Sequence, residues 1–168
     1  MSKDYTFNPG DFVVYPAHGV GQITEISKTA VGEQELELIA INFDKDKLTL
    51  RIPLQNAHNA GLRQIADAQQ MEKALHVLTE KAKVKRVQWS KRATEYNSKI
   101  NSGDIIACAE VIRDLYKHPT KGEQTYSERQ IYEQAMGRLA AELATVQQTD
   151  QQQASQQLET ILQNKFSL

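Results

Sequence analysis

The 168-residue sequence changes character at Pro53, and this change constrains the fold more than any other feature. Before Pro53, apolar and polar residues alternate in short runs between Gly, Pro and Asp, which is typical of strands joined by tight turns. After it, apolar residues recur every three or four positions, as on one face of a helix. The sequence therefore predicts an α+β protein: a small Tudor-like or SH3-like β-barrel over residues 1–60, then an all-α domain over residues 61–168.

The first part contains four runs with strand character, at residues 12–15, 22–28, 36–43 and 48–52. In the last run, Leu48, Leu50 and Ile52 alternate with Thr49 and Arg51. Successive side chains of a strand point to opposite faces, so we expect Thr49 and Arg51 to project away from the core.

The second part carries signals for helix ends. Asp67 and Asp104 each precede a helical pattern and can cap it. Thr125 and Glu128 have the spacing of a capping box, in which a hydroxyl and a carboxylate satisfy amides at the helix start. The Gln-rich stretch 147–157 is compatible with a helix, and we interpret it as the start of a last helix rather than as disorder. That helix would pack through Ala154, Leu158, Ile161 and Leu162.

Residues 81–92 (KAKVKRVQWSKR) form a block of positive charge. They hold six of the 20 basic residues, no acid, and Trp89, the only tryptophan, so the rest of the chain has 14 basic and 21 acidic residues. A local basic block in an otherwise acidic chain indicates a surface for an anionic partner, and its aromatic ring can stack or wedge. A solvated helix face is the plainer alternative.

Two patterns disagree about whether Trp89 is buried. Trp89, Ala93, Tyr96 and Ile100 share one helical face, which slightly favours a core position. Ser90 can serve as an N-cap, in which case Trp89 would precede the helix and face solvent at a corner. The sequence alone leaves both positions open.

No catalytic or metal-binding set is recognisable in the sequence. Gly19 and Gly21 lack the third glycine of a phosphate-binding loop. Cys108, the single cysteine, cannot form an internal disulfide, and its apolar neighbours predict a buried, inert thiol. The four histidines lie at no ligand spacing from another His, Cys or carboxylate: His18, His58, His76 and His118. We therefore expect a protein that is not an enzyme and has no metal and no cofactor.

The sequence also bears on location and assembly. No apolar signal region opens it, and no apolar run approaches the roughly 18 residues of a membrane span. We expect a monomeric cytoplasmic protein without membrane contact.

A series of short motifs occurs in a fixed order along the chain. They are GDFVVYPAHGVG (10–21), LTLRIP (48–53), GLR (61–63), WSKR (89–92), SGD (102–104), AEVIRDL (109–115) and SER (127–129). Together they resemble the bacterial CarD/CdnL family of transcription regulators over roughly residues 7–148. The first motif also resembles the opening of the RNA-polymerase-interacting module of transcription-repair coupling helicases, but no helicase motor accompanies it here.

The resemblance implies a Tudor-like module that binds the β subunit of RNA polymerase. It also implies a helical domain that reaches promoter DNA at the upstream edge of the transcription bubble, where Trp89 matches a tryptophan that wedges into the minor groove. Some family members carry a basic residue in place of Thr94. The DNA surface that the resemblance implies comprises Trp89, Lys91, Arg92 and Arg129. We add to it Lys85 and Arg86 of residues 81–86, which we call the basic lead-in.

The polymerase-binding surface implied by the resemblance corresponds to Thr29, Ala30, Val31 and Arg51. Some family members carry an arginine where this chain has Thr29, although Lys28 lies beside it. We interpret the chain as a regulator that stabilises open promoter complexes and holds DNA phosphates without reading bases. The alternative is a protein–protein adaptor whose β-barrel binds a partner and whose helices dimerise or dock without DNA contact.

Overall fold

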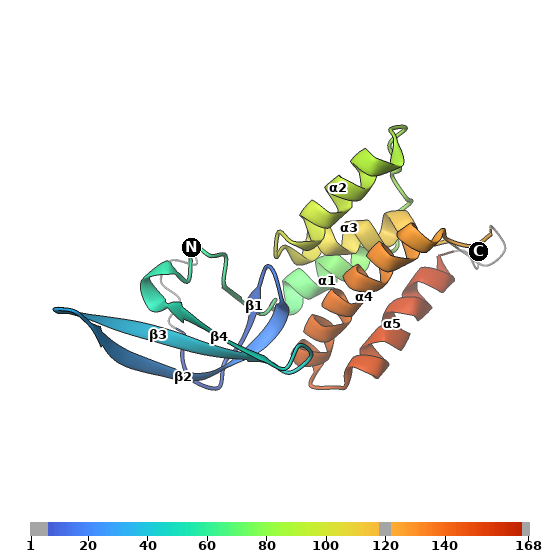
Figure 1. The fold of residues 1–168 in the computed structure, drawn as a ribbon. Helices are drawn as coiled ribbons and strands as arrows, with labels where there is room; N and C mark the ends of the chain where they lie inside the picture. Colours follow the sequence, from blue (N-terminus) through green and yellow to red (C-terminus); the bar gives the residue numbers. More distant parts are fainter. Residues whose placement is uncertain (1–6, 118–121, 166–168) are drawn as a thin grey trace. The chain divides into compact units, whose positions relative to one another are not determined.

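The computed structural model describes residues 7–117 and 122–165, so His118 lies outside the described residues. The chain divides into two compact units, residues 1–65 and residues 66–168, and each is described by itself (Figure 1). The division falls after Ile65, later than the predicted boundary at residue 60, because a short strand at Arg63–Gln64 pairs with Val13 and Val14.

The described residues of the first unit form a five-stranded antiparallel sheet in the order β4-β3-β2-β1-β5. The four predicted strands are confirmed, but the second is longer than predicted and the fifth was not predicted. In Figure 1 the second and third strands form a long hairpin. The bounds are β1 (Phe12–Tyr15), β2 (Gly19–Val31), β3 (Gln34–Phe43), β4 (Leu48–Pro53) and β5 (Arg63–Gln64), with a 3₁₀ turn at Leu54–Asn56.

The packing of this unit's core explains why β2 carries a glycine at position 21. A Cβ added to Gly21 would lie only 2.7 Å from side-chain atoms of Ile41 and Phe43, which are 0% and 1% exposed. The strand therefore approaches the core more closely than any side chain would permit. On β4 the predicted alternation is confirmed, because Thr49 and Arg51 are exposed while its other central side chains are half-buried.

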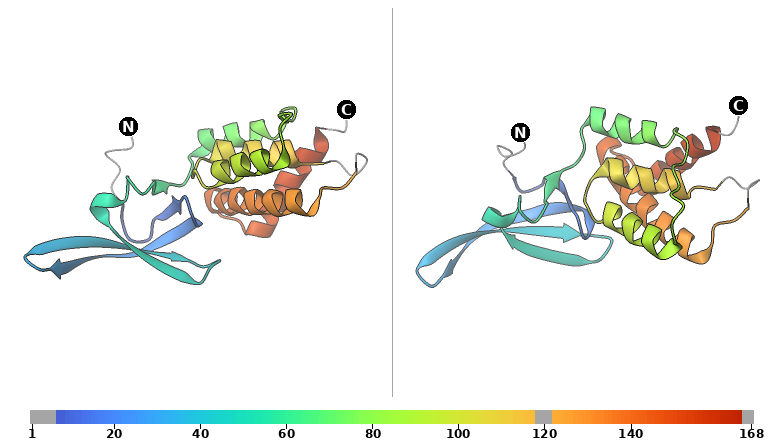
Figure 2. Two further views of the ribbon diagram at one scale, coloured as in Figure 1. Left: turned by 45° about the horizontal axis from the view of Figure 1, so that its top comes forward. Right: turned by 90° about the horizontal axis from the view of Figure 1, so that it is seen from above.

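The described residues of the second unit form five helices, so the predicted α+β fold is confirmed. Figure 2 shows two further views of these helices. The predicted caps are confirmed: Asp67 and Asp104 accept hydrogen bonds from helix amides, and Thr125 and Glu128 form the capping box. The bounds are α1 (Ala68–Val77), α2 (Trp89–Ile100), α3 (Ile105–Leu115), α4 (Tyr126–Gln147) and α5 (Gln151–Asn164).

The Gln-rich stretch is helical, but it is shared between two helices. Gln147 ends α4, Gln148 adopts a left-handed conformation (φ 58°), and Asp150 caps α5. The three inner side chains of α5 are each 0% exposed, so this helix completes the core: Ala154, Leu158 and Leu162. Complete burial of a leucine contributes about 1.5–3 kcal/mol, which explains why a polar helix is held in place.

Cys108 is buried as predicted, and its thiol donates to the carbonyl of Ala135 at 3.2 Å. In the described part of the chain, no helix is long and apolar enough to cross a membrane.

Candidate functional site

The basic lead-in has no regular secondary structure and lies between the end of α1 and the start of α2. All of its residues are exposed. The N-cap of α2 is Gln88, whose carbonyl accepts from the amides of Lys91 and Arg92, both at 3.1 Å. The alternative in which Ser90 caps the helix is therefore wrong, and Trp89 is the first helical residue.

Trp89 lies between the two positions that the sequence left open. Its side chain is partly buried and packs against the helical core. The indole ring lies 6.2 Å from the ring of Tyr96, tilted by 52°. Trp89 is thus neither a closed core residue nor a fully exposed one, and part of the indole remains available at the start of α2.

Arg92 holds this arrangement together. Its guanidinium carbon lies 5.3 Å from the centre of the Trp89 ring and 5.7 Å from that of Tyr96. One terminal nitrogen, Nη2, donates to the Tyr96 hydroxyl at 3.3 Å, whereas Nε is buried and has no partner among the described residues. A cation over aromatic rings stabilises the contact by about 0.5–2 kcal/mol, so Arg92 orients the indole.

The predicted basic residues differ in their surroundings. The ammonium group of Lys85 contacts both carboxylate oxygens of Glu95, at 3.0 and 3.3 Å. Arg86 and Lys91 are exposed and make no ion pair with another described residue. The unit therefore presents some cations directly to solvent and holds Lys85 against its own acid.

Arg129 is exposed in the first turn of α4, next to the capping box. Both α2 and α4 begin at the same end of the helical unit (Figures 1 and 2). Burial alone would raise the pKa of Glu128, but the Thr125 amide at 2.9 Å and the Lys117 ammonium at 3.3 Å outweigh it and hold the pKa below its ordinary value. An ionised Glu128 thus fixes the turn that carries Arg129.

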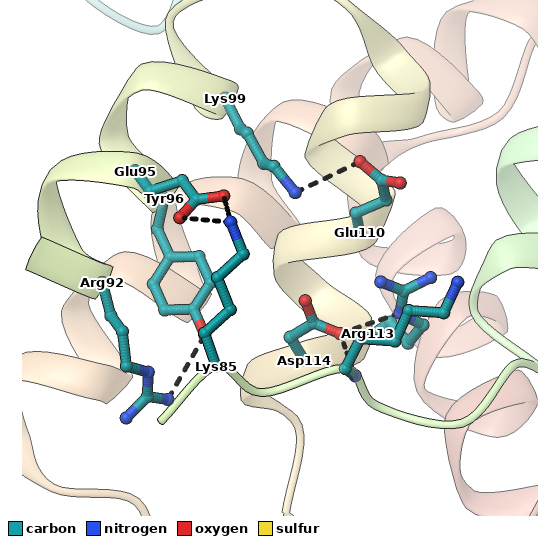
Figure 3. Close-up of a pocket in the computed structure, with 9 residues that line it drawn as sticks. Lys85, Arg92, Glu95, Tyr96, Lys99, Glu110, Arg113 and Asp114 are labelled. Atoms are coloured by element: carbon teal, nitrogen blue, oxygen red, sulfur yellow. Dashed lines mark hydrogen bonds and ion pairs between the residues drawn. The ribbon is translucent and has the colours of Figure 1, made fainter. Parts of the chain in front are cut away.

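A cavity of about 200 Å³ lies between the basic lead-in, α2 and α3 (Figure 3). On its wall, Lys99 pairs with Glu110 at 3.3 Å. Cations outnumber acids among its lining residues, so the cavity has a positive balance of charge. The lining residues are Lys83, Lys85, Arg92, Glu95, Tyr96, Lys99, Glu110, Arg113 and Asp114.

In the β unit, Thr29, Ala30 and Val31 are exposed at the end of β2, and Val31 is 57% exposed. They pair with Leu36, Glu35 and Gln34 respectively.

Arg51 is exposed on the edge strand β4, opposite Ala40 of β3. Ala40 and Leu36, the partner of Thr29, are four residues apart along β3. At about 3.4 Å per residue, this spacing separates Arg51 from the hairpin tip by at least about 13 Å along the sheet. The four predicted residues therefore form two separate points on one sheet rather than a cluster.

Sequence reasoning missed two residues of the α2 site. Tyr96 is four positions from Arg92, a spacing at which helix side chains meet, so this contact could have been predicted. The contact of Glu95 with Lys85 could not, because the basic lead-in has no regular structure to fix their spacing. Among residues 7–117 and 122–165, no group of three or more His, Cys, Asp or Glu could hold a metal ion.

Comparison with known proteins agrees with this architecture. Residues 7–66 match the family model of the CarD-like/TRCF RID domain, and residues 73–159 match that of the CarD C-terminal domain. The chain is also 26% identical to YdeB of Bacillus subtilis (strain 168), a candidate transcription factor by its name, over 140 residues that cover 83% of this chain and 92% of that protein.

Both units of the fold are accounted for by these matches, which define a transcription regulator of two modules. The chain belongs to the CarD/CdnL family, which is not known for enzymatic activity.

Proposed function

We propose that the chain binds the β subunit of RNA polymerase through residues 1–65 and stabilises the promoter open complex through its helical unit. In this proposal Trp89 wedges into the minor groove at the upstream edge of the transcription bubble. The observation that carries it is the setting of Trp89: the only tryptophan is oriented by Arg92 and Tyr96 at the first position of α2, beside exposed cations.

The physical chemistry of the α2 site supports this role. An apolar wedge between base steps offsets the cost of unstacking, about a few kcal/mol per step, through new contacts. The contacts that orient the indole are of similar or smaller size, so the ring can shift onto a base without disrupting the helix. Lys91 and Arg86 would hold backbone phosphates by releasing counterions, which needs no base recognition. Arg129 and Lys85 would add contacts of the same kind.

Attachment to polymerase would make weak DNA binding sufficient. A tethered site has an effective concentration in the millimolar range when the linker is short, so a modest intrinsic affinity still gives high occupancy. The match of residues 7–66 to the CarD-like/TRCF RID domain supports the assignment of the β unit to polymerase.

The test of the wedge is the variant Trp89→Ala in a promoter-opening assay. We expect a shorter open-complex lifetime, with polymerase association unchanged in a pull-down, because only the helical surface is altered. Lys91→Ala serves as a comparison, since loss of one phosphate contact should weaken DNA binding without removing the wedge. Unchanged lifetimes for Trp89→Ala on several promoters would contradict the wedge.

The polymerase-binding surface is tested separately with Arg51→Glu. Reversing this exposed charge should abolish association with the β subunit while the fold is retained, because the side chain makes no contribution to the core. Lys45→Glu is the matched control, since it reverses an exposed charge in the turn between β3 and β4. Normal association of the Arg51 variant would contradict the assignment.

One observation favours the adaptor as a second candidate: Trp89 packs against the helical core. Tryptophan fluorescence reports only this residue. An emission that responds to forked DNA in the presence of polymerase supports the wedge. A blue-shifted emission that is poorly quenched and indifferent to DNA supports the adaptor.

A further inference from the structure

The course of the basic lead-in is determined by an acidic residue on another helix. The backbone amide of Lys83 donates to Oδ1 of Asp114, at 2.9 Å, although Lys83 itself is exposed. Within the described part of the chain, no other amide between residues 81 and 87 donates a hydrogen bond. This single backbone contact therefore connects the irregular segment to α3.

Asp114 is an unusual group to find at such a contact. It is 9% exposed, and the same Oδ1 accepts from Nε of Arg113 at 2.8 Å. Arg113 is 3% exposed and also pairs with Glu80, the residue before the lead-in, at 3.0 Å. Figure 3 shows the Arg113 and Asp114 side chains meeting at the wall of the cavity. Charged groups are rarely buried unless they are paired and hydrogen-bonded. Here the partners outside α3 are Glu80, just before the lead-in, and the backbone amide of Lys83 within it.

The hydrogen-bond network around Arg113 and Asp114 extends through Glu80 to the residue that follows α5. The ammonium group of Lys165, just after α5, donates to the backbone carbonyl of Glu80 at 3.2 Å. Burial alone lowers the pKa of Arg113, but its contacts with Asp114 and Glu80 outweigh burial and raise that pKa, so the cation stays charged. Residues of α3 and the residue that follows α5 thus contribute to holding the beginning of the lead-in.

We propose that Arg113 and Asp114 are positioning residues that hold the basic lead-in in place over α3 and so set how many of its cations reach the phosphate backbone of DNA. The proposal rests on the proposed function, because it assumes that the partner is DNA. Lys81, Lys83 and Arg86 repel one another and would spread apart on an unanchored segment. Anchoring them before binding reduces the ordering cost that each phosphate contact carries.

The decisive experiment compares Lys83→Pro with Lys83→Ala in the full chain. Both remove the lysine charge, but only proline removes the amide hydrogen that Asp114 accepts. The buried Arg113–Asp114 pair remains in both variants, so neither leaves an unpaired buried charge. Val84→Pro and Val84→Ala are the matched controls, because the Val84 amide has no hydrogen-bond partner among the described residues.

The measured quantity is the dependence of forked-DNA affinity on salt. Each phosphate contact contributes about 0.9 to the slope of log K against log [salt] for duplex DNA. We expect the magnitude of the slope to fall in Lys83→Ala by the equivalent of at most about one phosphate contact. In Lys83→Pro it should fall by the equivalent of about one to two contacts more. Loss of stability alone would lower the active fraction without changing the slope, and thermal unfolding measures it separately. Equal slopes for the two Lys83 variants would overturn the proposal.

A second measurement tests the anchor without DNA. Amide hydrogen exchange in the unmodified chain should be slower at Lys83 than at Val84 or Arg86, although all three residues are exposed. Equal exchange rates at these amides would also overturn the proposal. Measuring Trp89→Ala on the same forked DNA distinguishes failure of the anchor proposal from failure of the proposed function. If Trp89→Ala weakens DNA binding but the two Lys83 variants do not differ, only the anchor proposal is wrong. If Trp89→Ala has no effect, the proposed function fails.

Discussion

The two candidate binding surfaces of this protein are built in different ways. At the end of the β2–β3 hairpin, backbone pairing fixes Thr29 and Val31, and their exposed side chains take no part in the core. At the start of α2, Trp89 is oriented by the side chains of Arg92 and Tyr96. A substitution on the hairpin should therefore change one contact, whereas a substitution at α2 should also move its neighbours.

The largest expected effect comes from core substitutions that destabilise one unit and leave the other folded. Leu158→Ala removes a side chain that is 0% exposed in the helical core and should destabilise that unit by about 2–5 kcal/mol. Ile41→Ala, also at a 0% exposed position, should do the same to the β unit. We expect Leu158→Ala to abolish the effect on open complexes but preserve polymerase association, and Ile41→Ala to lose polymerase association first. Simultaneous loss of both properties in each variant would show that the surfaces do not depend on separate cores.

The next effect tests whether side-chain contacts matter more at α2 than on the sheet. Arg92→Lys keeps the charge but loses the planar group that lies over two rings, an interaction of about 0.5–2 kcal/mol. We expect altered Trp89 emission and DNA affinity about three- to tenfold weaker. Arg51→Lys is the counterpart on β4 and should change polymerase association much less, because Arg51 has no such contacts among the described residues. If the two substitutions have equal effects, side-chain contacts matter no more at the start of α2 than on the sheet.

The same contrast explains what the sequence could predict. Strands, helices and caps follow from local patterns, so the capping box at Thr125 and the inner face of α5 were predicted correctly. The surroundings of Trp89 were not predicted. They depend on whether the helix starts at residue 89 or later, and on the direction in which the Arg92 side chain points. Contacts such as that of Asp114 with Lys83 join segments 31 residues apart through an irregular stretch, and no periodicity encodes them.

A smaller effect concerns the end of the helical unit that carries Arg129. Glu128→Gln removes the carboxylate of the capping box and should cost about 1 kcal/mol of helical-unit stability at neutral pH. The pKa of Glu128 is lower in the folded protein than in the unfolded chain. Its ionised form therefore stabilises the fold fully above the unfolded pKa of about 4.3, and this contribution is lost as the pH falls through the lower folded pKa.

Denaturant unfolding at a series of pH values measures this difference. The gap in unfolding free energy between the unmodified chain and Glu128→Gln should be widest above about pH 5 and should narrow below it. Glu123→Gln, at an exposed site in the preceding loop, should show no such gap. A constant gap at every pH would mean that the charge of Glu128 does not stabilise this end of the unit.

The smallest effect sharpens the electrostatic side of the comparison. Glu95→Gln removes the acid that pairs with Lys85, at an exposed contact whose loss should change stability by less than about 1 kcal/mol. Lys85 would then be available to a phosphate and the surface would gain one unit of positive charge, so forked-DNA affinity should rise about twofold to fivefold at low salt. The gain should vanish at high salt, because exposed charges are screened there. Glu110→Gln frees Lys99 instead, whose side chain is less exposed (29%, against 68% for Lys85), and should give a smaller increase. If both variants bind DNA as the unmodified chain does, Lys85 lies outside the DNA-binding surface, and the ion pair with Glu95 serves only to hold the lead-in against α2.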